Sequence, residues 1–460
     1  MRPTRREAME AGLLAMSVAA LPRCACYGGT PPPPLPSRPP SVTPWPEANA
    51  ILAATTVPTF AEAVFAVTDS GAVGDGSTDN TAAFTRTIAA CHRAGGGRVL
   101  VPPGIWVVGA LRLRSGVELH VERGATLMFS GNAELFPPVA TRFEGIECVN
   151  RSPMIYAYDE TNIALTGDGC LDASLTSAWN HGSDRAGILE PLVARGVAPS
   201  RRSVVGMLRT SFVQPYRCTN VLVRGVTLQG ARFWQIHPVL CTNVTIDGVV
   251  TRVAGANTDA CDPESCRRVV IRGCTFASGD DNIAVKSGRD DDGRRVATPC
   301  EDIVIMNCQG EGRFGFICLG SEQTGGIRNV YAYNNRTFGR GVGWMLWVKS
   351  NSRRGGFTEN VRIDGFTGAG FRNAVVGITM TYAGQSGDAP PRFDGLQFSR
   401  LDVRDAPMPF DIEALPSSPL GLLTVRDARF LNMASPTSRL INAPHIVTRD
   451  VLVNGATFAL

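Results

Sequence analysis

Residues 255–288 read GANTDACDPESCRRVVIRGCTFASGDDNIAVKSG, and the centre of this stretch is a unit that repeats along the chain. An apolar triplet begins at Val269, follows a polar residue and precedes a Gly-Cys pair. From Val221 to Val361, similar triplets recur roughly 23 to 34 residues apart, and most of them follow Asn, Arg or Asp. The triplets are Ile163-Ala-Leu, Val221-Leu-Val, Val244-Thr-Ile, Val269-Val-Ile, Ile303-Val-Ile, Val330-Tyr-Ala, Val361-Arg-Ile, Leu423-Thr-Val and Val451-Leu-Val.

Self-similarity at such a period predicts stacked coils. The repeated units alternate apolar and polar residues, as strands do, and show little helical periodicity after residue 100. This pattern disfavours helical and leucine-rich solenoids. We therefore predict an all-β fold, a parallel β-helix, in which stacking buries the apolar face that no single coil can bury alone.

A helix is expected to cover the N-terminal end of this solenoid. Asp79 or Asn80 is a suitable N-cap for it, and the three glycines Gly95–Gly97 end it before a strand at Arg98–Val101. The apolar residues at helical spacing are Ala83, Phe84, Ile88 and Cys91.

The segments before the solenoid have a different composition. Residues 1–30 resemble an export signal, because Arg5-Arg6 precedes the short apolar run Ala11–Leu21. The twin arginines indicate the Tat route to the periplasm or the medium; an ordinary secretory signal and a basic tail are the alternatives. Residues 31–58 are proline-rich and predict a stiff linker. Residues 59–460 are expected to form the catalytic β-helix domain.

The 13 cysteines follow the repeat rather than a metal-binding pattern, since no CxxC pair or His-containing zinc spacing occurs. Cys218, Cys241, Cys266 and Cys300 each lie near the start of an apolar segment. We interpret them as small buried residues stacked at matching positions on successive coils. A disulfide, for example between Cys261 and Cys266, is the alternative.

Composition limits the possible partners. The formal net charge is +4, and Lys and Arg are dispersed without a basic stripe. This distribution does not indicate a nucleic-acid partner. We expect no metal, no cofactor and no membrane contact beyond export, and we expect a monomer.

Counting from each triplet brings several polar and aromatic residues to one face of the solenoid. Asp280 and Phe314 each lie 11 residues after the start of a triplet, so they share a phase on successive coils. Asp259 lies 15 residues after the start of its triplet, and Lys349 and Tyr382 lie 19 and 21 residues after theirs. The face should collect Asp259, Asp280, Asp281, Phe314, Lys349 and Tyr382.

Paired carboxylates on a rigid scaffold suit general acid/base hydrolysis of a glycosidic bond. A single Asp at a coil corner often only caps backbone groups. A cluster of acids is harder to explain in that way, because the charges repel one another. Asp280 and Asp281 can both serve one site only if the chain bends at Gly279, since adjacent strand residues face opposite sides.

Two other features have structural explanations. Residues 290–293 read DDDG and resemble part of a calcium loop, but they lack its alternation and its distal Glu, so a solvated turn is expected. His237 lies among apolar residues. A core histidine with satisfied hydrogen bonds is the default interpretation, and a donor at the floor of a cleft is the alternative.

At these residues the chain resembles the polygalacturonase family of glycoside hydrolases, family 28, especially its bacterial branch. The resemblance covers most of residues 60–455. The segments that carry it are GAVGDGSTDNT (71–81), RFEGIECVNRSPMIYAY (142–158), FWQIHPVLC (233–241), NTDACDPES (257–265), GDD (279–281), IAVKSG (283–288) and GSE (320–322).

This resemblance implies a right-handed parallel β-helix and hydrolysis of pectic polymers with inversion. It implies Asp280 as the general acid, and Asp259 and Asp281 as the residues that position and deprotonate the water. Inversion leads us to expect carboxyl groups about 6.5–9.5 Å apart. The candidate substrate-binding residues are Asn257, His237, Lys286, Phe314, Trp347, Lys349 and Tyr382.

The chain departs from the family pattern at two places. Arg313-Phe314-Gly315 stands where the family has Gly-His-Gly, and Trp347-Val348-Lys349 stands where it has Arg-Ile-Lys. In the family, that Arg and Lys hold a galacturonate carboxylate. Phe314 can only desolvate the acids, and Trp347 offers a stacking face in place of a carboxylate clamp. We therefore hypothesise an altered leaving-group subsite that takes a neutral, esterified or differently substituted sugar.

Other functional classes remain as alternatives. A non-catalytic carbohydrate-binding β-helix derived from the family would have no need of three clustered acids. A calcium-dependent pectate lyase-like β-helix would release unsaturated products, and a tailspike-like stalk would need a trimerisation segment.

Overall fold

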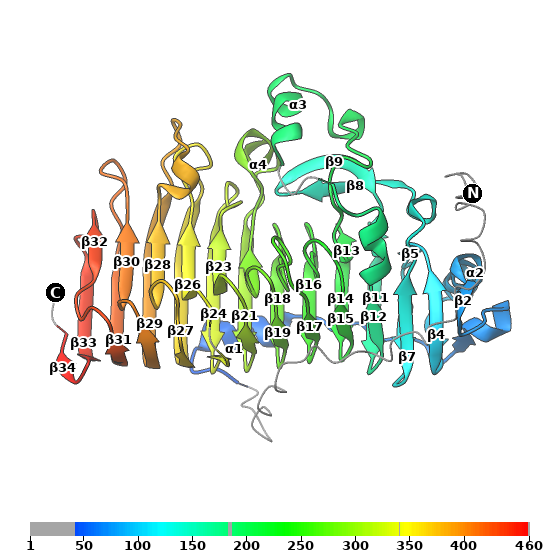
Figure 1. Ribbon diagram of the computed structural model, residues 1–460, viewed down its shortest axis with the longest axis horizontal. Coiled ribbons are helices and arrows are strands. Elements are labelled where there is room, and N and C mark those ends of the chain that lie inside the picture. The colour runs from blue at the N-terminus through cyan, green and yellow to red at the C-terminus, as the bar shows by residue number, and fades with distance from the viewer. Residues whose placement is uncertain (1–41, 183–185, 340, 459–460) are drawn as a thin grey trace, which may run out of the picture. The chain divides into compact units, whose positions relative to one another are not determined.

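Three ladders of parallel strands run through the part of the chain that the computed structural model describes, residues 42–182, 186–339 and 341–458 (Figure 1). Most coils contribute one strand to each ladder. Parallel strands joined by crossovers are right-handed in nearly all proteins, and the fold is the predicted right-handed parallel β-helix.

The first ladder contains β1 (Val64–Ala66), β3 (Gly97–Val101), β6 (Val117–Val121), β11 (Thr161–Gly167), β14 (Thr219–Arg224), β16 (Thr242–Asp247), β18 (Arg267–Arg272), β21 (Cys300–Met306), β24 (Ile327–Tyr333), β27 (Phe357–Ala369), β29 (Arg392–Ala406), β31 (Leu423–Met433) and β33 (Ile446–Val453). The second contains β2 (Asp75–Asp79), β4 (Gly104–Val108), β7 (Ala125–Phe129), β12 (Cys170–Asp172), β15 (Thr227–Gln229), β17 (Val250–Arg252), β19 (Thr275–Ala277), β22 (Gln309–Glu311) and β25 (Arg336–Thr337).

The third ladder carries the candidate site. It contains β5 (Leu111–Arg112), β10 (Ile155–Tyr158), β13 (Val213–Tyr216), β20 (Ile283–Val285), β23 (Gly315–Gly320), β26 (Trp344–Lys349), β28 (Val376–Thr379), β30 (Phe410–Glu413) and β32 (Arg439–Ile441). Single bridges at Ile236 and Cys261 continue the ladder from β13 to β20.

The remaining elements lie outside these ladders. They are the hairpin β8 (Pro138–Phe143) and β9 (Ile146–Arg151), the short β34 (Ala456–Thr457), the helices α1 (Pro46–Ala54), α2 (Thr81–Arg93), α3 (Glu190–Ala194) and α4 (Asp290–Val296), and the 3₁₀ turns η1 (Val67–Ser70), η2 (Ala133–Leu135), η3 (Ser174–Ala178), η4 (Ala186–Ile188), η5 (Pro199–Arg201) and η6 (Tyr382–Gly384). None of the helices in the described ranges has the length and apolarity needed to cross a bilayer.

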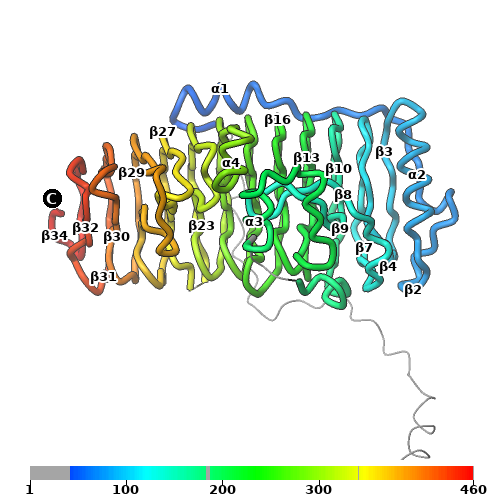
Figure 2. The backbone as a smooth tube through the Cα atoms, turned by 90° about the horizontal axis from the view of Figure 1, so that it is seen from above, coloured from blue at the N-terminus to red at the C-terminus, as the bar shows by residue number. Residues whose placement is uncertain are grey.

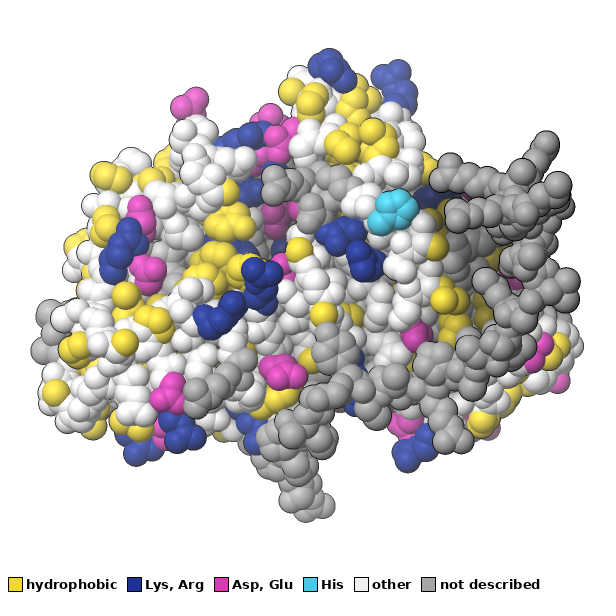
Figure 3. Space-filling model, in the orientation of Figure 1, with side chains coloured by type: hydrophobic (Ala, Val, Ile, Leu, Met, Phe, Trp, Pro, Cys, Tyr) yellow, Lys and Arg dark blue, Asp and Glu magenta, His cyan; other side chains and the backbone are white. Residues whose placement is uncertain are grey.

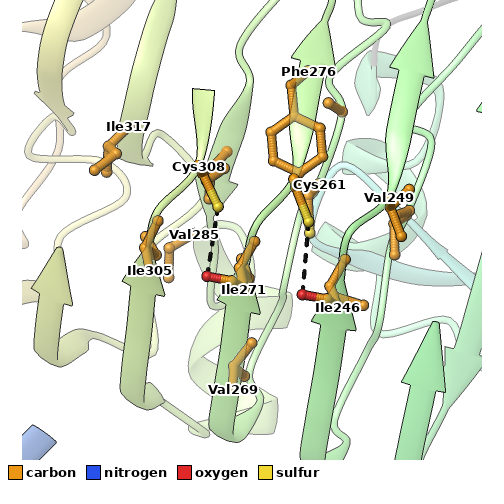
Figure 4. Close-up of a cluster of buried hydrophobic side chains, with 14 of the residues drawn as sticks. Ile246, Val249, Cys261, Val269, Ile271, Phe276, Val285, Ile305, Cys308 and Ile317 are labelled. Atoms are coloured by element: carbon orange, nitrogen blue, oxygen red, sulfur yellow. Dashed lines mark hydrogen bonds between the residues drawn. The ribbon is translucent and has the colours of Figure 1, made fainter. Parts of the chain in front are cut away.

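The apolar triplets stack in register and build the core. Ile246 pairs with Ile271, which pairs with Ile305, and all three side chains are buried (Figure 4). The register also corrects two assignments. A coil at Leu396 lies between those at Val361 and Leu423, and Ile446, not Val451, is the partner of Leu423.

The asparagines that precede several of the triplets stabilise the turn into the strand. Asn220, Asn243 and Asn329 have φ angles of 56°, 57° and 56°, a left-handed conformation that Asn adopts more readily than most residues. The Asn243 amide donates to Asn220 Oδ1 at 2.7 Å. One coil earlier, the Asn220 amide donates to Asn162 Oδ1 at 2.8 Å. The ladder of amides turns the chain into each strand and joins successive coils.

The cysteines behave as the repeat predicts. All eleven that the structure describes are free and buried. The Sγ atoms of Cys241, Cys266 and Cys300 accept the backbone N–H of the corresponding cysteine on the preceding coil at 3.3–3.4 Å. The stacking interpretation is therefore confirmed, and the alternative of a disulfide between Cys261 and Cys266 is wrong.

Helix α2 caps the N-terminal end of the solenoid, as predicted (Figure 1). Its apolar stripe, including Phe84 and Cys91, is fully buried. Asp79 supplies the N-terminal contact, since its Oδ1 accepts the Thr81 N–H at 2.9 Å. The Asn80 side chain bonds the backbone of Val73 instead.

The expected linker at 31–58 is corrected in part, because helix α1 forms within it. Trp45 packs against Tyr331 with ring centroids 5.7 Å apart, and Ala48 is buried with Val304 and Met306 on the outside of the first ladder. Figure 2 shows α1 running alongside these coils. The signal expected at 1–30 lies outside the described residues.

Candidate active site

A bend in the chain brings the adjacent acids Asp280 and Asp281 to one site. The backbone bends at Gly279 and Asp280. A Cβ on Gly279 would lie only 2.2 Å from the carbonyl oxygen of Gly255, so glycine is required for the close approach of the two coils. The bend at Gly279 that both acids need in order to face one site is therefore present.

The acids line a pocket of about 270 Å³ on the third ladder. Figure 3 shows hydrophobic, basic and acidic side chains close together over the middle coils of this face. The pocket is lined by Glu144, Trp234, Asn257, Asp259, Asp280, Asp281, Lys286, Arg289, Phe314, Ser321, Glu322, Trp347, Lys349, Arg354 and Tyr382.

Asp280 and Asp281 have different partners. Asp280 is half-buried, and its carboxylate accepts the backbone N–H of Asn257 and of Asp281, each at 3.0 Å. Asp281 is 1% exposed. Its Oδ1 accepts the Gly315 N–H at 2.8 Å, and its Oδ2 lies 2.9 Å from Lys349 Nζ.

These surroundings separate the pKa values of the two acids. Burial, and then the charge of Asp281, raise the pKa of Asp280. Burial would also raise the pKa of Asp281, but Lys349 and the hydrogen bonds from Cys318 and Gly315 outweigh it and hold that pKa below its usual value. Asp280 is therefore the more easily protonated of the two acids, and Asp281 is the more easily ionised.

Asp259 lies one coil before Asp281 and is 3% exposed. Burial, and then the nearby Asp262, raise the pKa of Asp259 well above its usual value. Asp262 is fully buried, and neither of its oxygens has a hydrogen-bond partner among the described residues. Lys286 Nζ lies 3.9 Å from Asp259 and 3.8 Å from Asp262. Asp259 thus favours the protonated form.

The nearest oxygens of the three acids lie close together. One oxygen from each of Asp259, Asp280 and Asp281 lies within 4.8 Å of the other two. Asp259 lies one coil before the other two acids, and neighbouring strands are about 4.7–4.9 Å apart, so the pairing of the coils brings its carboxylate beside theirs. The group could ligate a cation, but Lys286 and Lys349 already place positive charge beside it.

Comparisons with known proteins identify the family. A model of the glycosyl hydrolases family 28 matches residues 205–383, and a model described as rhamnogalacturonase A/epimerase, pectate lyase-like, matches residues 64–165. The structure of an exopolygalacturonase from Thermotoga maritima is 33% identical, covers 90% of this chain and 96% of that chain, and superposes with a TM-score of 0.82. The chain belongs to glycosyl hydrolases family 28.

Curated members of family 28 are also similar in sequence. A probable polygalacturonase of Vitis vinifera is 27% identical over 76% of this chain and 71% of its own length. An exo-poly-alpha-D-galacturonosidase of Dickeya chrysanthemi is 26% identical over 76% of this chain and 64% of its own length. Membership of family 28 makes the protein a glycoside hydrolase.

Aromatic rings gather at Phe314 and Trp347, the two positions where we expected a departure from the family pattern. Phe314 and Trp347 are stacked at 6.1 Å, and Trp344 lies against Trp347 at 4.0 Å. Tyr382 meets Trp347 edge-on at 5.7 Å. Lys349 Nζ lies 4.0 Å from the centroid of Trp347. The rings form an apolar wall beside the acids.

The structure places six of the seven candidate substrate-binding residues on the pocket and leaves out one. His237 is fully buried and does not line it. Its Nε2 lies 2.9 Å from Glu264 Oε2, and its Nδ1 lies 2.9 Å from Gln214 Nε2. Glu264 also pairs with the buried Arg142 of β8 at 3.2 Å. The assignment of His237 to substrate binding is corrected, because these residues tie the β8–β9 hairpin to the coils.

The acidic run at 290–293 is not a solvated turn. It begins α4, and only Asp291 is well exposed. Asp292 is fully buried, accepts the Glu147 N–H at 2.8 Å, and pairs with Arg202 at 2.6 Å and Arg295 at 2.9 Å. The acid therefore anchors α4 to the hairpin that rises beside the pocket.

Several pocket residues were not predicted from the sequence. Arg289 of the segment before α4 pairs with Glu144 at 2.8 Å and with Glu190 of α3 at 2.7 Å. Glu322 belongs to a segment that carries the family resemblance, which could have identified it. Arg354 lies on a loop after β26. Counting from a triplet does not predict which way a side chain on such a loop faces.

A larger groove, of about 1030 Å³, lies elsewhere, between residues 58–64 and the outer face of the first ladder. Its charged side chains pair with one another, as Arg98 does with Glu118 at 2.8 Å and Arg123 with Asp168 at 3.0 Å. No group of three clustered acids was found there among the described residues. The smaller pocket is therefore the candidate active site.

Proposed function

We propose that this protein hydrolyses a pectic polysaccharide or oligosaccharide with inversion, as a polygalacturonase-like enzyme whose leaving-group subsite is altered. The observation that carries the proposal is the cluster of Asp259, Asp280 and Asp281, whose pKa values are displaced in different directions within one pocket. The names of the family 28 relatives support the pectic substrate.

Each acid has a separate role in this mechanism. Asp280 donates its proton to the glycosidic oxygen as the bond from C1 to that oxygen breaks. A water attacks C1 from the opposite side and gives its proton to the ionised Asp281. Asp259 holds the water by a hydrogen bond. After product release, proton exchange with solvent returns Asp280 to its protonated form and Asp281 to its ionised form.

The proposed inversion rests on the family resemblance and not on the spacing of the acids. In this pocket the water would lie between Asp259 and Asp281, which occupy paired coils, with Asp280 to one side. The spacing of the nearest oxygens alone would equally suit the shorter separation of retaining enzymes, about 5–5.5 Å.

The aromatic wall supports the altered subsite. Phe314 immediately precedes β23 and is aligned with Asp280 on the neighbouring coil, where its N–H lies 3.5 Å from the Asp280 carbonyl. Phe314 and Trp347 offer faces for a sugar ring and no charge for a carboxylate. The unit that leaves is therefore proposed to be neutral, esterified or differently substituted.

We also propose exo action. The β8–β9 hairpin, α3 and α4 rise at the ends of the third-ladder strands (Figure 1), and Glu144 and Arg289 from these parts line the pocket. Two similar proteins are named as exo-acting enzymes. The pattern of residues 1–30 supports export, and we propose that the exported protein acts as a monomer.

The test compares the wild type with Asp280→Asn on pectic polymers and oligosaccharides that differ in esterification and substitution. We expect release of short products with inverted anomeric configuration, and a loss of more than about a hundredfold in the variant. Retention of configuration would overturn inversion, and efficient hydrolysis of unesterified polygalacturonate as the preferred substrate would overturn the altered subsite. Binding without release on any substrate would favour a non-catalytic carbohydrate-binding protein.

A further inference from the structure

Arg354 is fixed at the edge of the pocket where the strands of the third ladder end. It follows β26 in a tight turn, in which Asn351 Oδ1 accepts the N–H of Arg353 at 3.0 Å and of Arg354 at 2.9 Å. The Gly355 N–H closes the turn on the Asn351 carbonyl at 2.8 Å. The Arg354 side chain is only 4% exposed and lines the pocket.

The guanidinium of Arg354 has N–H groups to spare. Its Nη2 lies 3.5 Å from Glu322 Oε1. No residue in the described ranges accepts a hydrogen bond from its buried Nε or Nη1. Its central carbon lies 5.8 Å from the ring centroid of Tyr382. A buried donor without an acceptor destabilises the folded protein, so this position suits an anionic ligand that enters the pocket.

The other cations of the pocket have carboxylate partners within the protein. Lys349 pairs with Asp281 at 2.9 Å, and Lys286 pairs with Glu322 at 3.2 Å. Both Nη groups of Arg289 are occupied by carboxylates of the hairpin and α3, at 2.8 and 2.7 Å. Arg354 is therefore the pocket cation best placed to receive a carboxylate from outside.

We propose that Arg354 binds the carboxylate of a hexuronate unit of the substrate, which makes it a specificity-determining residue of this site. The proposal rests on the proposed function. Phe314 precedes β23 and Arg354 follows β26, so the two lie at opposite edges of the same parallel ladder. The acidic unit lies toward Arg354, and the neutral or esterified unit lies against the aromatic wall.

The test measures binding in an Asp280→Asn background, which allows intact oligosaccharides to be titrated by calorimetry. The probes are unesterified trigalacturonate and the same trisaccharide with each carboxylate reduced to a primary alcohol. Arg354→Gln is expected to weaken trigalacturonate binding by about tenfold or more, because hydrogen bonds to a charged group contribute about 1.5–3 kcal/mol. Affinity for the reduced trisaccharide should not change.

The matched control is Arg353→Gln on the same turn. Arg353 pairs with Glu190 at 2.9 Å and Asp290 at 3.0 Å and does not line the pocket. It should leave the affinity for both probes unchanged. Arg354→Lys keeps the charge, should fold if the Gln variant does not, and should restore part of the preference for the acidic probe.

Two outcomes would overturn the proposal. They are equal weakening of both probes by Arg354→Gln, and no weakening of either. The hydrolase proposal is tested separately by wild-type turnover. If no pectic substrate is cleaved but the Arg354-dependent preference is measured, the hydrolase proposal fails and the assignment of Arg354 stands.

Discussion

Lys349 Nζ lies 2.9 Å from Asp281 Oδ2, while among the described residues the oxygens of the neighbouring Asp280 have only backbone N–H partners. This one ion pair makes two adjacent aspartates chemically different. It lowers the pKa of Asp281 beside an acid whose pKa burial and charge repulsion raise. A general acid and a general base need such a difference to operate at the same pH.

Removing this lysine should move the pH profile to higher pH. Lys349 lowers the pKa of both Asp281 and Asp280, so in Lys349→Met both pKa values rise. The low-pH limb of kcat/KM, which requires ionised Asp281, and the high-pH limb, which requires protonated Asp280, should each move upward by about one unit or more. Lys349→Arg keeps the charge and should move the limbs much less. Unchanged limbs in the Met variant would show that the lysine does not control these acids.

The aromatic wall should contribute to binding of the leaving-group unit. Trp347→Ala removes a stacking face worth about 0.5–1.5 kcal/mol, so KM for the preferred oligosaccharide should rise about two- to tenfold. Trp347→Phe keeps a ring and should retain most of the affinity. Steady-state kinetics on oligosaccharides of one length provide the measurement, and equal KM values for the two variants would contradict the role of stacking.

The buried Asp292 should stabilise the protein in a pH-dependent way. Burial would raise its pKa, but its bonds to Arg295, the Glu147 N–H and Arg202 outweigh this and lower it. A lowered pKa means that the stabilisation is complete above the pKa of the unfolded chain, about 3.9, and is lost as the pH falls through the lower folded pKa. Asp292→Asn should reduce the free energy of unfolding at pH 7 by about 3–5 kcal/mol.

Asp291 is the matched control for that measurement, because it lies on the same helix with its side chain 69% exposed. Asp291→Asn should change the free energy of unfolding by less than about 0.5 kcal/mol. Denaturant unfolding at pH 7 and about pH 3, below the unfolded pKa, measures both variants. A loss in Asp292→Asn no larger than that in Asp291→Asn would show that the ion pairs do not hold α4 in place.

The cysteine ladder predicts insensitivity to reductant. The eleven described cysteines are free, so dithiothreitol should leave Tm unchanged. Cys266→Ala should lower Tm by a few degrees, because it opens a small cavity and removes the acceptor for the Cys241 N–H. A fall of Tm in reductant alone would indicate a disulfide and contradict the ladder.

The sequence predicts the parts of the fold that depend on repetition. The apolar triplets mark the first ladder because each lies at the same place on its coil, and the acids are found because they lie a fixed distance beyond a triplet. The prediction fails at Val451, which lies in the same strand as Ile446, five positions after the residue that pairs with Leu423. The triplet at Val451 is the more apolar end of that strand, so its composition marks the strand but not where the coil begins.

Other parts of the site depend on contacts between distant segments. The burial of His237 follows from Arg142 and Glu264, which lie 95 and 27 positions away in the chain. Arg354 is held by a turn whose length has no counterpart in the repeat. Such positions depend on tertiary packing between distant segments, and the repeat pattern of the sequence does not predict that packing.

Helix α1 also constrains the order in which the chain can fold. Trp45 and Ala48 pack on Val304, Met306 and Tyr331, which leave the ribosome more than 250 residues later. The binding surface for α1 does not exist until those coils have formed, so the helix remains undocked while most of the chain is synthesised. The docking of α1 is therefore a late folding event, which occurs only after the coils in the middle of the solenoid have formed.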